Sequence, residues 1–205
     1  MIQQPSVTRV DLLNYLVKRF GYRRYLEIGV ADDYACFSRV QCEHKIGVDP
    51  ERGGTHRMTS DAFFAQVADT WDLIFIDGLH EASQVYRDIE HAIERLSPNG
   101  SIVMHDCNPE REEEAKYPPM NLSRGVWNGD VWKTFAYWRT RTEVDAACGD
   151  FDWGCGVIRL RPNTDPWSAG SSWQHDFRRL SWTDLVFHRR RLLRLMKFDE
   201  LKEWL

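Results

Sequence analysis

The sequence lacks the features that mark several classes of protein. No apolar run approaches the ~20 residues that a membrane-spanning helix needs, so we expect no membrane partner. The formal net charge of −4 provides no basic surface for nucleic acid. The first residues show no basic region followed by an apolar core, so no secretory signal is predicted. Together these absences favour a cytoplasmic protein.

The cysteines offer neither a zinc module nor a disulfide framework. They are odd in number, no C-x-x-C pair occurs, and their spacings match no zinc-binding pattern. We therefore expect reduced thiols, most of them buried, at the five positions Cys36, Cys42, Cys107, Cys148 and Cys155.

What the sequence does contain is a regular alternation of short apolar runs and helical patterns. Residues 72–77 and 100–105 are apolar runs too short for a lone helix, and such runs are typical of buried parallel strands. Between them, residues 81–96 repeat apolar side chains at helical spacing. The same alternation predicts strands at 24–30 and 45–49, and helices at 7–20, 33–40 and 61–68. A doubly wound, mostly parallel α/β sheet with right-handed crossovers follows.

This alternation breaks in the second half of the chain. Residues 107–128 form a long polar connection, and such long connections in compact domains are usually functional or disordered; we expect a lid-like connection there. After a helix at 130–139, two strands at 142–147 and 154–160 flank a gap that is too short for a crossover helix. This last pair of strands is therefore predicted to be antiparallel.

The length and composition favour one domain over residues 1–205, because the chain can bury one ordinary core. We expect that core at about residues 22–160 and a helical extension at about 163–205. The helices of this extension leave a homodimer open.

Carboxylate and imidazole side chains follow two successive predicted strands. Asp77 and His80 come at the end of the first, and His105 and Asp106 at the end of the second. In open α/β sheets, ligands bind at the carboxyl ends of the strands. We expect these four side chains to lie together at a functional site.

The first two predicted strands carry the elements of a nucleoside site. Gly29 stands where a strand turns into the next segment, and a small residue there lets the backbone approach a ligand. Asp49 ends the second strand and can hold the two hydroxyls of an adenosine ribose.

The cofactor that suits this loop carries no pyrophosphate. A nicotinamide cofactor would require G-x-G-x-x-G, but Ala31 and Tyr34 occupy the later glycine positions. The two acidic residues after Ala31 would also repel a pyrophosphate. S-adenosylmethionine (SAM) fits better, because its ammonium group can lie near Glu27 or Asp77 and its sulfonium tolerates carboxylates.

Five segments taken together resemble the successive motifs of class I SAM-dependent methyltransferases. The most similar group is that of bacterial small-molecule O-methyltransferases with I-D-G-x-H and H-D signatures, which is related to macrocin-type and caffeoyl-CoA-type enzymes. The resemblance covers roughly residues 22–160. It is carried by residues 25–30, 46–50, 60–61, 75–80 and 97–106.

This resemblance implies a Rossmann-like methyltransferase fold, with a seven-stranded sheet that includes a C-terminal antiparallel strand. Glu27 and Gly29 would border the methionine moiety, Asp49 the ribose, and residues 60–62 the adenine. The full set of implied cofactor-binding residues is Glu27, Gly29, Val30, Asp49, Ser60, Asp61, Ala62, Asp77 and Gly78.

A hydroxyl acceptor must lose its proton, and the residues allow two mechanisms of deprotonation. His80 or His105 could act as a general base, since imidazole titrates near neutrality, and Asp77 joins them as a catalytic candidate. Alternatively, Asp77, His105 and Asp106 could hold a divalent cation such as Mg²⁺. Macrocin-type enzymes hold a metal with carboxylates at these strand ends, although an imidazole at position 105 softens the ligand set.

The predicted function is transfer of a methyl group from SAM to a hydroxyl of a small molecule or glycan. The connection before the helix at 130–139 would supply the acceptor wall, with Trp127, Asn128, Asp130 and Trp132 as candidates. A non-catalytic cofactor-binding module and a metal-dependent oxidoreductase on the same fold remain alternatives, and N-methylation stays open.

Overall fold

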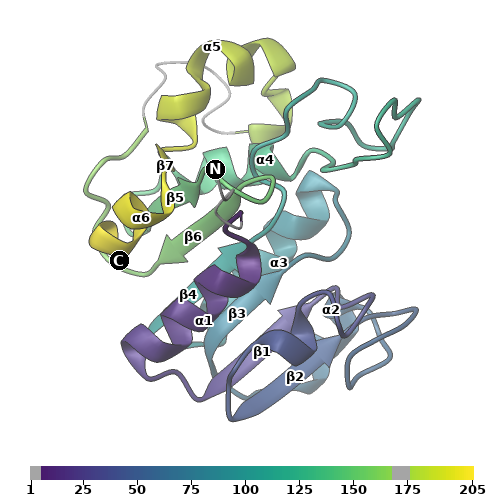
Figure 1. Ribbon diagram of the computed structural model, residues 1–205, viewed down its shortest axis with the longest axis vertical. Coiled ribbons are helices and arrows are strands. Elements are labelled where there is room, and N and C mark those ends of the chain that lie inside the picture. The colour runs from purple at the N-terminus through teal and green to yellow at the C-terminus, as the bar shows by residue number, and fades with distance from the viewer. Residues whose placement is uncertain (1–5, 168–175) are drawn as a thin grey trace, which may run out of the picture.

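Seven strands form one mixed sheet in the computed structural model, which describes residues 6–167 and 176–205. The strand order is β2-β1-β3-β4-β6-β5-β7, and Figure 1 shows the sheet crossing the molecule. The strands are β1 (Arg24–Ile28), β2 (His44–Val48), β3 (Trp71–Ile76), β4 (Leu96–Met104), β5 (Asp145–Gly149), β6 (Cys155–Arg159) and β7 (Leu195–Met196).

The sheet has a parallel half and an antiparallel half. Strands β2, β1, β3 and β4 run parallel, whereas β6 runs antiparallel to both β4 and β5. The predicted doubly wound α/β fold with a C-terminal antiparallel strand is thus confirmed. The short edge strand β7, which pairs in parallel with β5, was not located from the sequence.

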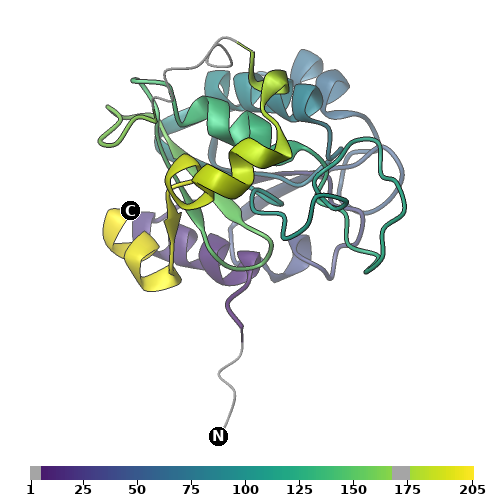
Figure 2. The ribbon, with the colours of Figure 1, turned by 90° about the horizontal axis from the view of Figure 1, so that it is seen from above.

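Helices cover both faces of the sheet, as Figure 2 shows from above. The first and last helices pack on one face, where Leu13 and Leu201 join Tyr25 and Phe75 in an apolar core. The remaining helices cover the other face. The helices are α1 (Arg9–Phe20), α2 (Ser60–Gln66), α3 (Ala82–Glu94), α4 (Val131–Trp138), α5 (Trp182–Leu192) and α6 (Phe198–Trp204), with 3-10 turns η1 (Phe37–Arg39) and η3 (Phe177–Arg179).

The predicted helix at 33–40 is wrong, because this crossover contains only turns and η1. Asp32 Oδ1 accepts the N–H of Tyr34 at 2.9 Å, and Asp33 Oδ1 accepts the N–H of Gly54 at 2.8 Å. Short acidic side chains that bond to nearby backbone compete with helix formation. The second of these bonds also ties the loop after β1 to the loop after β2.

A buried carboxylate anchors the C-terminal extension to the antiparallel half. Asp145 is fully buried and accepts bonds from Arg161, Arg194 and Trp204 at 3.0, 2.8 and 3.1 Å. Of the extension expected at 163–205, residues 168–175 lie outside the described part of the chain. No helix within 6–167 or 176–205 is long and apolar enough to cross a membrane.

Candidate active site

A cleft of about 450 Å³ lies at the carboxyl ends of β1, β2 and β3. This volume is within the ~300–1,000 Å³ typical of small-molecule sites. We call it the nucleoside cleft. Its lining includes Gly29, Ala31, Asp49, Ser60, Asp77, Gly78, His80 and Gln84.

Asp49 is held in this cleft by backbone donors. Its Oδ2 accepts the N–H of Ala31 at 2.9 Å, and its Oδ1 accepts those of Glu51 and Arg52 at 2.8 and 2.9 Å. Burial opposes ionisation, but these N–H donors outweigh it and lower the pKa of Asp49. Since a carboxylate has roughly four acceptor positions, one of them is left for a ligand hydroxyl.

Gly29 is required by the neighbouring strand as well as by any ligand. Its φ is +86°, and a Cβ there would lie 2.3 Å from both the carbonyl oxygen of Asp77 and the Cα of Gly78. A side chain would therefore push the ends of β1 and β3 apart. From the sequence, this glycine was expected only to allow close approach of a ligand.

Only one of the three predicted adenine-flanking residues lines the cleft. Ser60 lines the nucleoside cleft, whereas Asp61 and Ala62 are not among its lining residues. Gln84 Nε2, which the sequence argument missed, donates to Ser60 Oγ at 3.2 Å and to Asp61 Oδ1 at 3.2 Å. Its position in the first turn of α3, directly after β3, was the available signal, because the carboxyl end of β3 faces the cleft.

A second cleft, of about 390 Å³, adjoins the first. We call it the acceptor cleft. Gly29, Ala31, Asp77 and His80 line both clefts. The other residues lining the acceptor cleft include Arg9, Glu27, Val30, His105, Asp106, Trp127 and Trp153.

The four side chains predicted to meet at the strand ends form a ring of alternating oxygen and nitrogen atoms. Asp77 Oδ1 lies 3.5 Å from His80 Nε2 and 3.3 Å from His105 Nδ1. Asp106 Oδ2 lies 3.2 Å from His80 Nε2 and 3.3 Å from His105 Nδ1. The four side chains thus lie together, as expected from their positions at the strand ends.

The end of the 107–128 connection holds two members of this ring. His80 Nδ1 donates to the carbonyl oxygen of Trp127 at 3.0 Å, which leaves Nε2 facing the carboxylates. Asn128 Nδ2 donates to Asp106 Oδ1. Gly129 allows this approach, since a Cβ there would lie 1.8 Å from the carbonyl oxygen of His80. Outer contacts of this kind fix the orientation of functional imidazoles and carboxylates.

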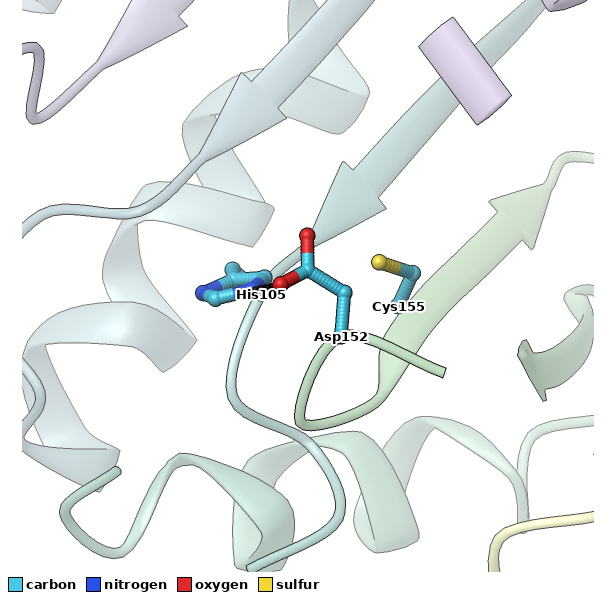
Figure 3. A group of neighbouring side chains, drawn as sticks. All are labelled: His105, Asp152 and Cys155. Atoms are coloured by element: carbon cyan, nitrogen blue, oxygen red, sulfur yellow. Dashed lines mark ion pairs between the residues drawn. The ribbon is translucent and has the colours of Figure 1, made fainter. Parts of the chain in front are cut away.

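The far side of His105 meets residues that the sequence argument did not connect to the site. Arg9 Nη1 lies 3.1 Å from His105 Nε2 and 3.2 Å from Asp152 Oδ2. Figure 3 shows His105 at the end of β4 facing Asp152 and Cys155 of the β5–β6 hairpin. Ligand atoms of these three residues lie within 4.8 Å of one another. The Arg9 guanidinium supplies the positive charge beside this group.

In the ring, the oppositely charged neighbours together shift the pKa values more than burial does. Burial would raise the pKa of Asp77, but the two imidazoles lower it well below its usual range. Burial would lower the pKa of His80 and of His105, but the carboxylates of Asp77 and Asp106 raise both. Glu27 lies beside the ring, and burial raises its pKa to about 7. The hydrogen bond that it accepts from the Tyr25 hydroxyl at 2.5 Å acts in the opposite direction.

The candidate acceptor wall is only partly formed by the expected residues. Trp127 lines the acceptor cleft and stacks on Tyr117, with ring centroids 6.1 Å apart. Asn128 does not line this cleft, but its side chain donates a hydrogen bond to Asp106, which does. Asp130 instead accepts the N–H of Ala82 at the start of α3, and Trp132 is buried in the core.

Part of the sequence and the fold are similar to those of known methyltransferases. Residues 26–107 match the model of a family described as a methyltransferase domain. No curated protein matches the chain. The structure is similar to that of the O-methyltransferase from Bacillus cereus in complex with SAH, at 17% identity and a TM-score of 0.55, covering 78% of this chain and 84% of that one.

Two further solved structures are similar. The O-methyltransferase TomG from Streptomyces achromogenes, involved in tomaymycin synthesis and in complex with SAM, has 14% identity and a TM-score of 0.55, covering 73% of this chain and 78% of that one. The SAH-bound Podospora anserina methyltransferase PaMTH1 has 17% identity and a TM-score of 0.55, covering 75% and 78%. The chain has the Rossmann-like class I methyltransferase fold that the resemblance implied.

Proposed function

We propose that the protein is a SAM-dependent methyltransferase that acts on a hydroxyl of a small molecule or glycan. One observation carries this proposal: the nucleoside cleft and the acceptor cleft share Gly29, Asp77 and His80. A nucleoside in the first cleft would thus end beside the carboxylates and imidazoles of the second. Methyl transfer is an in-line displacement, so bringing the two reactants together is the main task of the protein.

The residues present fit SAM. The ionised Asp49 has an acceptor position for a ribose hydroxyl, and Glu27 and Asp77 offer carboxylates to an ammonium group. Gly29, Val30, Ser60 and Gly78 complete the proposed contacts, while Asp61 and Ala62 stay predictions from the resemblance. When bound, SAM supplies an electrophilic methyl group.

The ring also fits a divalent cation, with His80 in place of the predicted His105. Ligand atoms of Asp77, His80 and Asp106 lie within 4.8 Å of one another. His105 is less suited, because its Nε2 faces the guanidinium of Arg9, so that in its neutral form the proton is on Nδ1, toward the ring. A cation held by Asp77, His80 and Asp106 would lower the pKa of an acceptor hydroxyl. Two carboxylates and one imidazole suit Mn²⁺ better than Mg²⁺, because an imidazole softens the ligand set.

His80 takes part in both proposed mechanisms for removing the acceptor proton, as a metal ligand in one and as the general base in the other. It lines both clefts, and its side chain is 20% exposed against 6% for His105. Without a cation, we propose that His80 receives the acceptor proton at Nε2, while Trp127 holds Nδ1. His105 then acts by orienting Asp77 and Asp106.

The proposal is tested by calorimetry with SAM and by transfer of a radiolabelled methyl group to a panel of hydroxyl compounds, with and without EDTA and added Mn²⁺ or Mg²⁺. We expect SAM binding and transfer. Loss of methyl transfer with EDTA, restored by adding one cation, would support the metal-assisted mechanism. SAM binding without transfer to any acceptor would favour a non-catalytic module, and absence of SAM binding would refute the proposal.

We further propose that the whole chain acts as one methyltransferase-like domain, with the 107–128 connection as part of the acceptor wall. This is supported by the contacts of Trp127 and Asn128 with His80 and Asp106. A cytoplasmic location and a homodimer stay predictions from the sequence.

A further inference from the structure

A tryptophan is presented at the mouth of the acceptor cleft by a strained turn. Trp153 is 39% exposed, and both Asp152 and Trp153 have left-handed backbone conformations, with φ of +47° and +56°. Such conformations are unfavourable for residues other than glycine and persist only where the surrounding structure enforces them. Here Asn108 donates its N–H to the carbonyl of Trp153 at 2.8 Å, and Arg9 donates its N–H to Asp152 Oδ2 at 2.7 Å.

Trp153 stands between two cavities. It lines the acceptor cleft, and it also lines a separate cavity of about 330 Å³ that the methyl-transfer site does not use. We call this the distal cavity. It is formed by residues 6–8 before α1, by Asn108 and Glu110 after β4, and by residues 150–154 of the β5–β6 hairpin.

Three carboxylates line the distal cavity, and two of them pair with arginines. Glu110 accepts from Arg124, and Asp152 from Arg9. Asp150 accepts from Asn108 Nδ2 at 3.1 Å. A carboxylate has roughly four acceptor positions, so each keeps room for a hydroxyl donor. Among the described residues that line the cavity, three are anionic and none is cationic, so the lining disfavours an anion, and its acceptor positions suit a molecule with many hydroxyls.

We propose that the acceptor is an oligosaccharide, with its methylated sugar in the acceptor cleft, the next sugar stacked on Trp153, and a further sugar in the distal cavity. This rests on the proposed function. Sugars present an apolar face of C–H groups that packs on an indole ring, and an edge of hydroxyls that bonds to carboxylates and guanidinium groups. A phenolic acceptor would fill the aromatic-walled acceptor cleft and would have no use for the distal cavity.

The test uses SAH-loaded protein and measures binding by saturation-transfer NMR. The probes are mono-, di- and trisaccharides of glucose, mannose, galactose, rhamnose and N-acetylglucosamine, with catechol and caffeic acid as phenolic probes. We expect at least one series in which the trisaccharide binds about tenfold more tightly than its monosaccharide, because extra subsites add contacts. The same series should accept radiolabelled methyl groups from SAM.

Single substitutions identify the residues that cause the gain in affinity from monosaccharide to trisaccharide. Trp153→Ala should remove most of it, and Trp153→Phe, which keeps an aromatic face, should retain most of it. Ser6→Trp, which fills the distal cavity, should weaken the trisaccharide and spare the monosaccharide. Phe187→Ala is the matched control, because this aromatic side chain is 77% exposed on α5 and lines neither cavity. Thermal unfolding checks that each variant is folded.

The outcomes separate the two proposals. SAM binding with transfer to catechol, and no binding of any sugar, would overturn the oligosaccharide proposal and leave the methyltransferase standing. Equal affinity for mono- and trisaccharides, or a gain that survives both Trp153→Ala and Ser6→Trp, would also overturn it. Absence of SAM binding would instead refute the proposed function itself.

Discussion

The nucleoside cleft and the acceptor cleft meet at Asp77 but hold their charged groups by different means. In the nucleoside cleft, Asp49 is fixed by three backbone N–H donors from loops next in sequence to β1 and β2. In the acceptor cleft, the ring depends on side chains from β3 and β4 and on segments remote in sequence, such as Arg9 and the β5–β6 hairpin.

This difference has a physical consequence. A site built from local backbone forms wherever its strands form, whereas a site built from remote side chains forms only when the helices and the hairpin dock correctly. Changes in the remote segments should therefore damage acceptor chemistry and leave cofactor binding intact. Substitutions in the antiparallel half, in the ring, in α1 and at Glu27 test this difference.

The largest effect is expected from Asp145→Ala in the antiparallel half. The substitution leaves Arg161 and Arg194 without their buried partner, and breaking such a pair costs about 3–5 kcal/mol. Urea denaturation should show that loss in the free energy of unfolding. Glu143→Ala is the control, because its pair with Arg141 is exposed and should cost under about 1 kcal/mol. A loss no greater than that of the control would mean that Asp145 does not anchor the extension.

The next effect is on catalysis, with Asp106→Asn in the ring. Asparagine has the same shape and tolerates the φ of +60° at this position, so the fold should survive. Because the variant removes a carboxylate that faces His80 and His105, we expect methyl transfer to fall by about a hundredfold. SAM affinity by calorimetry should stay unchanged, since Asp106 is held by His80, His105 and Asn128 and is not one of the proposed SAM contacts. The control is Asp69→Asn, an exposed carboxylate paired with Arg24. An equal fall in SAM affinity would contradict the separation of the clefts.

A remote contribution is tested by Arg9→Lys. Lysine keeps the charge but cannot reach His105 and Asp152 with the same forked geometry, so we expect transfer to fall by about tenfold with SAM affinity unchanged. Arg19→Lys on the same helix is the control, because Arg19 is exposed and lies outside both clefts. If both variants behaved alike, the N-terminal helix would have no part in the acceptor side.

The same contrast explains what could be predicted from the sequence. The meeting of Asp77, His80, His105 and Asp106 followed from strand pattern alone, because parallel strands bring their carboxyl ends to one edge of the sheet. Arg9, Asp152 and Trp153 could not be found in this way, since their positions depend on how α1 and the hairpin dock. No periodic pattern encodes that docking.

The misplaced helix at 33–40 has a similar cause at shorter range. The alternation of strands and helices predicted a helix there, but the side chains of Asp32 and Asp33 bond to the backbone of Tyr34 and Gly54. The second of these bonds joins two loops, so it forms only in the folded sheet. Local pattern therefore predicted the strands better than the segment between them.

The smallest effect concerns Glu27, which lies in the acceptor cleft and is 1% exposed. With its pKa raised by burial to about 7, the side chain is half ionised at pH 7. At pH 6 the ionised fraction falls about fivefold, so SAM affinity should fall by the same factor if the carboxylate receives the ammonium group. Calorimetry at the two pH values measures this. Glu27→Gln should abolish the dependence, and a dependence that persists in the variant would assign it to another group.

The stability of the protein without SAM should respond to Glu27 in the opposite direction. Because the folded pKa is raised above the unfolded value, the contribution of this group is fully present below about pH 4.5 and is lost as the pH rises through about 7. Ionisation of Glu27 therefore weakens the empty protein while it strengthens SAM binding. The increase in unfolding temperature on adding SAM should consequently be larger at pH 7 than at pH 6, and Glu27→Gln should remove that difference. A larger increase at pH 6 would show that this carboxylate does not face the cofactor.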